Sequence, residues 1–235
     1  QRLLALPGGK ARSSARARVL HGLGTIIQEI SDYGQARPLL EESLSIWREL
    51  GDRRGMAAAL SALGWLAFEV GNFRAARSLS QEALLVNRGL GEKRGVAVAL
   101  FNLGMVAFQQ SEYPAAHTLF QESLALRREI GDRRGCAYVQ VSLGLMEQQR
   151  GNHGQAAAIL GEALAVFREL FDKQLMSWAL AHQGVVAYDL GEYDRAQRLL
   201  EESLALGREV GNKVIIAFAL SSLADVLRSQ GKVAL

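Results

Sequence analysis

A segment of 40 residues recurs along this chain with no slip in its spacing. The sequence Gly51-Asp52-Arg53-Arg54-Gly55 returns as Gly91-Glu92-Lys93-Arg94-Gly95 and Gly131-Asp132-Arg133-Arg134-Gly135, and in weaker form as Phe171-Asp172-Lys173 and Gly211-Asn212-Lys213. A Leu-Gly pair recurs in the same phase, at Leu23-Gly24, Leu63-Gly64, Leu103-Gly104 and Leu143-Gly144. A unit this short cannot bury its apolar face alone, so stacked neighbours must share one continuous core. The repeat therefore predicts an extended array.

Each repeat is predicted to hold two helices, called helix A and helix B. In the second repeat, helix A starts near Asp52, a good N-terminal cap, and ends before Gly71, which can adopt the left-handed conformation. Helix B runs from Asn72 to Leu90, and a lone last helix A spans 212–230. The repeat boundaries are 11–50, 51–90, 91–130, 131–170, 171–210 and a half repeat at 211–235. We expect one array over residues 1–235. The chain begins at Gln1 and stops within a repeat, so we also expect a longer parent protein.

Composition permits a large helical core and disfavours several functions. Hydrophobic residues make up 49% of the 235 residues, and the net charge is +3, from 27 basic and 24 acidic residues of mixed order. Because basic and acidic residues are mixed along the chain, the charge gives little support to nucleic-acid binding, which needs a basic face. The single cysteine, Cys136, allows no internal disulfide and fits a reducing, cytoplasmic compartment. The longest apolar run, Val214 to Leu220, is far below the roughly 20 residues that span a membrane.

The repeats resemble the tetratricopeptide family, in its long, 40-residue variety. The family pattern W-x2-L-G-x2-Y, then A-x3-F, is matched in the second repeat by Leu63-Gly64, Gly71, Phe73, Ala76 and Ala83. Leu60 takes the tryptophan position and Ala67 the tyrosine position. HEAT repeats have a similar length, but the Leu-Gly and Gly-Asn-Phe marks argue against them. The chain is similar to repeats of spindle-orientation adaptors, kinesin light chains and the arms of bacterial signalling ATPases and transcription regulators. The resemblance implies an all-α, right-handed superhelical solenoid of antiparallel helix hairpins.

Helix A carries two stripes. The first, Ala57, Leu60, Gly64 and Ala67, varies little between repeats, and we assign it to packing. The second, Ala58, Ser61, Trp65 and Phe68, varies, and in the family it lines the concave side. The candidate partner-binding residues on this side are Trp65, Phe68, Phe101, Asn102, Met105, Phe108, Tyr138, Leu145, Trp178, His182 and Tyr188. The alternative is that these side chains fill gaps between neighbouring A helices.

We expect the candidate residues to form one continuous patch centred on repeats two to four, with Phe108 as an anchor. In the family, an asparagine at the position of Asn102 often holds a peptide backbone, and a purely structural asparagine is the alternative. For His182 the alternative is a half-buried polar residue.

Five arginines occupy the place of the family's proline near the end of each helix B, namely Arg48, Arg88, Arg128, Arg168 and Arg208. One interpretation is a strip for an acidic partner. We favour the other, in which they complement helix C-termini and pair with Asp52, Asp132 and Asp172 four residues on.

The segments that resemble catalytic or nucleotide-binding motifs are incomplete. Gly8-Gly9-Lys10-Ala11 lacks the first glycine and the final hydroxyl of a phosphate loop, and Gly22-Leu23-Gly24 lacks the third glycine of a dinucleotide fingerprint. The four histidines show no metal spacing, and Cys136 is interpreted as a small buried residue. We therefore expect no enzyme activity, no cofactor and no metal.

Two functions fit the sequence. The first is a protein-interaction module whose concave groove holds a peptide or helix of a partner protein. The second is an effector-sensing or autoinhibitory arm of a larger bacterial signalling ATPase or transcription regulator, in which the groove receives another domain of the same chain. An ATPase or DNA-binding module in the flanking sequence would favour the second function.

Overall fold

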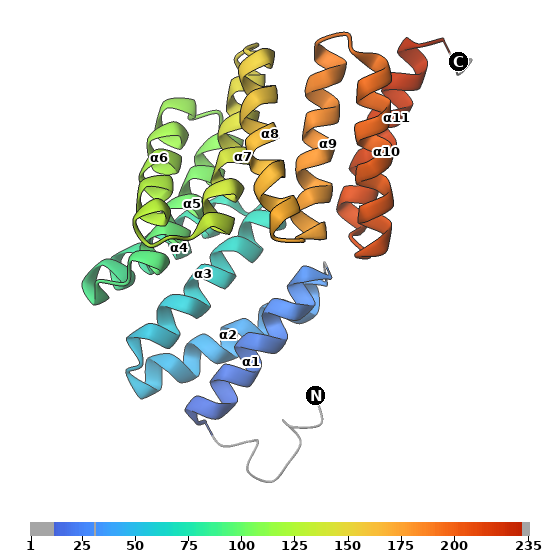
Figure 1. The fold of residues 1–235 in the computed structure, drawn as a ribbon. Coiled ribbons are helices and arrows are strands. Elements are labelled where there is room, and N and C mark those ends of the chain that lie inside the picture. Colours follow the sequence, from blue (N-terminus) through green and yellow to red (C-terminus); the bar gives the residue numbers. More distant parts are fainter. Residues whose placement is uncertain (1–11, 31, 232–235) are drawn as a thin grey trace. The chain divides into compact units, whose positions relative to one another are not determined.

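The computed structural model describes residues 12–30 and 32–231, and in these ranges it contains eleven α-helices and no strand (Figure 1). The helices are α1 (Ser14–Glu29), α2 (Tyr33–Leu50), α3 (Arg53–Glu69), α4 (Phe73–Leu90), α5 (Lys93–Gln109), α6 (Tyr113–Glu129), α7 (Arg133–Gln149), α8 (His153–Glu169), α9 (Lys173–Asp189), α10 (Tyr193–Glu209) and α11 (Lys213–Ser229). The all-α class is confirmed. The rejected phosphate loop at 8–11 and the last four residues of the half repeat lie outside the described ranges.

Helix ends form where the sequence predicts them. The Asp52 carboxylate accepts a hydrogen bond from the N–H of Gly55 at 2.9 Å, and Asp132 and Asp172 cap α7 and α9 in the same way. Gly91 ends α4 in the left-handed region at φ 68°. Phe171 occupies the matching turn at φ 53° although it has a side chain. The N-terminal caps and turn positions recur every 40 residues, which explains why the helix boundaries could be predicted closely.

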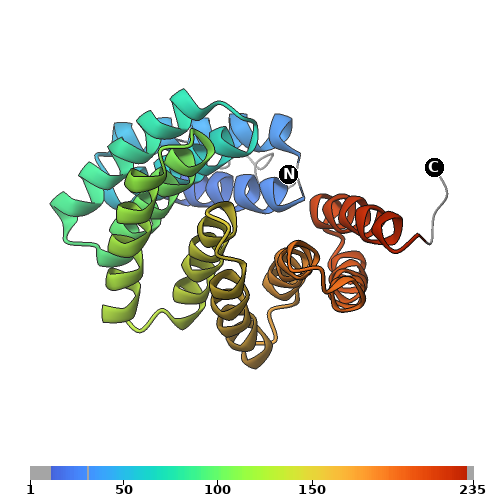
Figure 2. The same ribbon diagram turned by 90° about the horizontal axis from the view of Figure 1, so that it is seen from above.

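The helices form two compact units, residues 1–126 and 127–235. In the first unit, α3 packs against α4 of its own hairpin and against α1, α2 and α5. In the second unit, α9 packs in the same way against α10, α8, α7 and α11. Seen from above, the hairpins of the second unit stand side by side (Figure 2). Within its unit, α3 and α9 therefore each have their own helix B on one side and neighbouring hairpins on the others.

The first stripe of helix A is buried, as predicted. Ala57, Leu60, Gly64 and Ala67 all lie in the core. Its glycine faces a large side chain of helix B in four hairpins, and these side chains are Leu40, Phe120, Leu160 and Leu200. A Cβ atom built on Gly104 would lie 2.6 Å from the ring of Phe120. The glycine is thus required by close helix contact.

Ser80 breaks this pattern. It occupies the place of those large side chains in the second hairpin, and its hydroxyl is buried without a hydrogen-bond partner. Another buried serine, Ser43, donates its hydroxyl to the carbonyl of Ala17 at 2.8 Å. The two serines are equally buried but differ in whether the hydroxyl is satisfied.

This difference predicts opposite responses to the same substitution. Ser43→Ala removes a made hydrogen bond and should lower the free energy of unfolding by about 1 kcal/mol. Ser80→Ala removes an unsatisfied hydroxyl and should leave stability unchanged or raise it by up to about 1 kcal/mol. Urea denaturation followed by circular dichroism measures both, and an equal loss in the two variants would contradict the assignment.

The arginine series is exposed and pairs differently from the expectation. Arg48, Arg88 and Arg168 reach Glu82, Glu122 and Glu202 on the next helix B, at 2.8, 4.0 and 3.0 Å. Asp132 and Asp172 are instead held by Arg127 and Arg134. The expected pairing with aspartates four residues on is therefore wrong, because those aspartates turn back onto the helix N-termini that they cap. Exposed pairs of this kind contribute only about 0–1 kcal/mol each.

Candidate partner-binding surface

The second stripe of helix A is half-buried over most of its length, and its rings form contacts inside each unit. The half-buried candidates are Trp65, Phe68, Phe108, Tyr138, Leu145, Trp178, His182 and Tyr188. These residues present part of their surface to solvent and part to neighbouring helices. These side chains thus fill space between helices in part, and their role in partner contact stays a prediction.

Three candidates lie deeper than expected. Phe101, Asn102 and Met105 are 3%, 4% and 9% exposed. The Phe101 ring packs between Trp65 of α3 and Phe120 of α6, with ring centres 6.1 and 5.6 Å away. The Asn102 amide donates to the Ser61 carbonyl at 3.3 Å, which matches the structural interpretation of this asparagine. The expected exposed patch therefore differs at these residues, because rings and backbone of adjacent helices cover them.

A second group of rings packs at the turns between helix A and helix B of the same hairpin. Phe68, Phe108 and Tyr188 lie in the last turn of helix A, and each packs against the first aromatic residue of its own helix B. The Phe108 and Tyr113 rings, for example, meet edge to face at 5.8 Å. Phe108 thus contributes to hairpin closure, and its part as a binding anchor stays a prediction, as does continuity of the patch from Phe108 to Tyr138.

The second unit carries a series of touching rings on successive A helices. Tyr138 of α7 lies 5.0 Å from Trp178 of α9, Trp178 lies 5.4 Å from His182, and His182 lies 5.1 Å from Phe218 of α11. Burial among these rings lowers the pKa of His182 to about 4, so the imidazole is neutral at physiological pH. Phe218 is 36% exposed. Sequence reasoning missed Phe218, although it stands 40 residues after Trp178 in the repeat.

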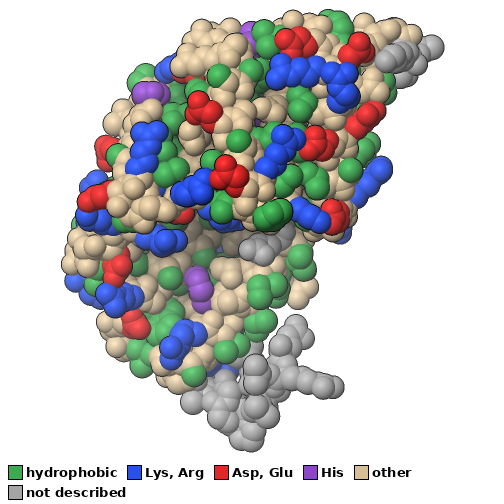
Figure 3. All heavy atoms as spheres, viewed as in Figure 1, with side chains coloured by type: hydrophobic (Ala, Val, Ile, Leu, Met, Phe, Trp, Pro, Cys, Tyr) green, Lys and Arg blue, Asp and Glu red, His purple; other side chains and the backbone are tan. Residues whose placement is uncertain are grey.

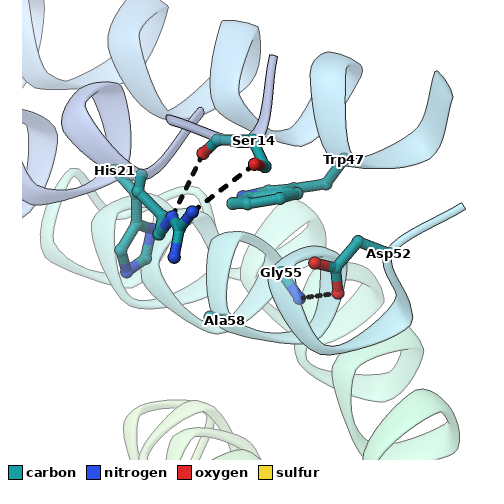
Figure 4. Close-up of a pocket in the computed structure, with 7 residues that line it drawn as sticks. Ser14, His21, Trp47, Asp52, Gly55 and Ala58 are labelled. Carbon is teal, nitrogen blue, oxygen red and sulfur yellow. Dashed lines mark hydrogen bonds between the residues drawn. The ribbon is translucent and has the colours of Figure 1, made fainter. Parts of the chain in front are cut away.

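The first unit contains a hollow of about 360 Å³ between α1, α2 and α3 (Figure 4). Its lining residues are Ser14, Arg18, His21, Trp47, Asp52, Gly55 and Ala58. The indole of Trp47 comes from helix B and fills the space that a Gly55 side chain would occupy. His21 and Asp52 lie on opposite sides of the hollow (Figure 4). Sequence reasoning missed this hollow because Trp47 is not on the helix A stripe.

In the next two repeats, the helix B residue at the position of Trp47 also lies against a glycine of the following helix A. Asn87 lies against Gly95, and the Arg127 guanidinium lies against Gly135. Asn87 donates to the Ala83 carbonyl of its own helix, and Arg127 donates to Asp132 at 2.8 Å. One helix B position therefore places an indole, an amide and a guanidinium against a glycine of the following helix A in successive repeats.

Other chemistry is sparse in the described part of the chain. No group of three or more His, Cys, Asp or Glu side chains in residues 12–30 and 32–231 could hold a metal ion. Burial raises the pKa of the half-buried Cys136 thiol, which disfavours the nucleophilic thiolate. Among these residues, no helix has the length and apolarity to cross a membrane. Acidic and basic side chains are interspersed on the face drawn in Figure 3.

Comparison with known proteins agrees with this geometry. BtubC from P. vanneervenii is 20% identical with a TM-score of 0.65, over 85% of this chain and 82% of that one. A signal transduction ATPase with numerous domains and a tetratricopeptide repeat sensor, from Pyrococcus horikoshii, is 15% identical with a TM-score of 0.65, over 94% of this chain and 34% of that one. The Rap conjugation gene regulator of plasmid pLS20, in complex with the Phr* peptide, is 14% identical with a TM-score of 0.76, over 87% and 60%.

These likenesses show the fold, and the chain spans only part of the ATPase and of the Rap regulator. No curated protein sequence matches the chain. The tetratricopeptide repeat family model matches residues 15–86, 75–129, 95–169, 133–209 and 175–234. Because these matches cover nearly the whole chain, it belongs to the tetratricopeptide repeat family.

Proposed function

We propose that this chain is a protein-interaction module that binds a peptide or helix of a partner against its A helices. The ring series Tyr138, Trp178, His182 and Phe218 carries the proposal. Four rings in contact, on three successive A helices, present a surface that is half-buried but not covered. Aromatic side chains with this partial burial supply large contact area at low entropic cost, and they are the residues most often found as binding anchors.

The neutral state of His182 fits this role. A charged imidazole would need solvation or an acidic partner, whereas covering a neutral ring with an apolar ligand avoids the much larger cost of burying a charge. Its low pKa, caused by burial, keeps it uncharged at neutral pH. The ring series is therefore suited to an apolar or aromatic segment of a partner. The Rap regulator of similar fold, solved with a peptide, supports this choice of ligand class.

A second candidate function is a regulatory arm within a larger signalling protein. The observation that favours it is the likeness to the ATPase with a tetratricopeptide repeat sensor, of which this chain spans a third. In that case the segment bound on the rings would belong to another domain of the same polypeptide, and the binding chemistry would be the same.

The test is selection of peptides from a random 12-residue phage display library, followed by titration of the best one. Trp178→Ala should weaken binding by about tenfold or more, the scale of a central aromatic anchor. Arg168→Ala, in the same unit but exposed on α8 and paired with Glu202, should change binding by less than about twofold. A thermal melt of each variant controls for folding.

The same titration with Phe218→Ala tests the more exposed end of the ring series. A selection that yields no binding peptide would count against the function. Peptides that bind the wild type, Trp178→Ala and Phe218→Ala equally would show that the ring series is not the binding surface.

A further inference from the structure

One side of α11, the last helix of the second unit, is apolar and open to solvent (Figure 1). The first stripe of helix A is buried throughout in α9, where it consists of Ser177, Leu180, Gly184 and Ala187. The matching stripe of α11 consists of Ala217, Leu220, Ala224 and Leu227. Its first three residues are exposed, Leu220 by 46%, and Leu227 is half-buried. The helix packs on α9 and α10 through a different side, which carries Ile215, Ala219, Leu223 and Val226.

Two positions make this stripe unlike the stripes that pack against a helix B. Ala224 stands where α3, α5, α7 and α9 have glycine. In α9, a Cβ atom on Gly184 would lie 2.6 Å from Cγ of Leu200 of α10. A helix B with leucine at that position therefore has no room against Ala224. Leu227 stands where α3, α5 and α9 have alanine, which adds bulk at a second contact.

The same stripe is complementary to a second copy of itself. Along α11 it reads small, large, small, large, with the spacing of three and four residues that lets two helices pack along a seam. In the opposite direction it reads large, small, large, small. Two α11 helices related by a two-fold axis and packed antiparallel would place Leu220 over the partner's Ala224. They would also place Leu227 over the partner's Ala217, and each contact would occur twice.

The charges on α11 fit this orientation. Lys173 at the start of α9 pairs with Glu209, whereas no carboxylate in the described part of the chain lies within ion-pair distance of Lys213 at the start of α11. Antiparallel packing brings Lys213 towards the C-terminal end of the partner's α11, where the helix dipole is negative. Asp225 and Arg228, which flank the stripe, already pair with each other at 3.0 Å. The interface therefore buries no charge that lacks a partner.

We propose that this protein forms a two-fold dimer through the open stripe of α11. A helix of this length is about 25 Å long, and one pair of such helices buries less than the roughly 1,600 Å² of a standard interface. The dimer therefore dissociates in the micromolar range. Phe218 projects from another side of α11, where its ring lies 5.1 Å from that of His182. Dimerisation thus goes beyond the proposed peptide binding and uses a different surface.

Sedimentation velocity from micromolar to sub-millimolar protein concentration tests the dimer. The wild type should change from monomer to dimer over this range. Leu220→Glu should raise the dissociation constant by about a hundredfold or more, because it would place two carboxylates in an apolar interface. Leu85→Glu is the matched control, since Leu85 of α4 is also an exposed leucine, at 73%, and it should leave the dimer unchanged. Both side chains are exposed in the monomer, so thermal melts should match the wild type.

Single and double variants test the orientation. Ala224→Leu would set two large side chains against each other, and Leu220→Ala would leave a gap, so each should weaken the dimer by about tenfold or more. The double variant with Leu220→Ala and Ala224→Leu restores large over small and should recover to within about threefold of the wild type. In a parallel pair Ala224 would face its own copy, and Ala224→Leu would tighten the dimer.

A wild type that stays monomeric over the whole range would overturn the proposal, as would dimerisation that survives Leu220→Glu. A tighter dimer with Ala224→Leu, or no recovery in the double variant, would rule out the antiparallel pairing. A synthetic peptide of Tyr193–Glu209, the sequence of α10, tests a helix B as the other occupant of the stripe. It should not bind α11, and dissociation of the dimer by this peptide would overturn the proposal. Leu220→Glu should keep peptide binding at the ring series, which separates this inference from the proposed function.

Discussion

Gly104→Leu is expected to lower the free energy of unfolding by about 3 kcal/mol, because overpacking a closely fitted core forces side chains and backbone to move. Gly104 is buried in α5, and the first atom of any side chain there would lie 2.6 Å from Cε1 of Phe120. Phe120 is itself fully buried, so the ring has no free direction in which to move. Urea denaturation followed by circular dichroism measures the loss.

Gly22→Leu is the matched control. Gly22 also lies in the middle of a helix A, but a Cβ atom there meets nothing within 4 Å. Replacing an unhindered helical glycine removes a penalty of about 0.8–1 kcal/mol relative to alanine, so this variant should equal or exceed the wild type in stability. If both variants lose stability equally, glycine serves the helices in some way other than close packing.

The repeat made the fold predictable because the same helix caps and turn residues recur in successive repeats. Asp52 and Gly91 act on the backbone within a few residues, so caps and turns follow from sequence alone. The packing stripe was predictable for a related reason: in four of the five hairpins its glycine faces a large side chain at one fixed distance along the chain. Functional surfaces are set by how helices meet, and the stripe pattern could not separate the buried Phe101 from the half-buried Trp178.

Sequence reasoning missed the contact between a helix B side chain and a glycine of the following helix A, although the sequence contains a signal for it. Two positions eight residues apart trade volume in four of five repeats, and the exception is Phe167 with Leu175. The pairs are Trp47 with Gly55, Asn87 with Gly95, Arg127 with Gly135, Phe167 with Leu175, and Gly207 with Ile215. A large or polar residue on helix B accompanies glycine on helix A, and the one glycine on helix B accompanies isoleucine. Comparison of repeats column by column would detect this exchange, whereas inspection of single helices does not.

Asp132→Ala is expected to cost about 3 kcal/mol or more, because breaking a buried ion pair leaves a charge without the carboxylate that compensates its burial. The side chains of Arg127 and Asp132 are only 9% and 13% exposed, and they meet at 2.8 Å. Burial lowers the pKa of Arg127, and the charge of Asp132 together with its hydrogen bond opposes that effect. Asp132 also caps α7 through the N–H of Gly135 at 2.9 Å.

Asp52→Ala separates the two roles. Asp52 makes the same capping bond to Gly55, also at 2.9 Å, but the helix B residue beside it is Trp47 rather than an arginine. Loss of a cap alone costs about 1 kcal/mol, so Asp52→Ala should be much milder than Asp132→Ala. Equal losses, measured by urea denaturation, would mean that the ion pair adds nothing beyond the cap.

A double-mutant cycle completes the test and bears on how the repeats acquire new chemistry. Arg127→Trp copies the arrangement of Trp47 over Gly55, because Gly135 lies beside position 127 as Gly55 lies beside Trp47. In that background Asp132→Ala should cost only about 1 kcal/mol, the value of the cap, because there is no longer a buried guanidinium to be left unpaired. If the cost stays near 3 kcal/mol, Asp132 supports α7 independently of Arg127. If it falls, position 127 and its counterparts accept an aromatic or a cationic side chain without change to the hairpin, as long as glycine stands opposite. The repeat can then vary the side chain at this helix B position while the fold is held by other residues.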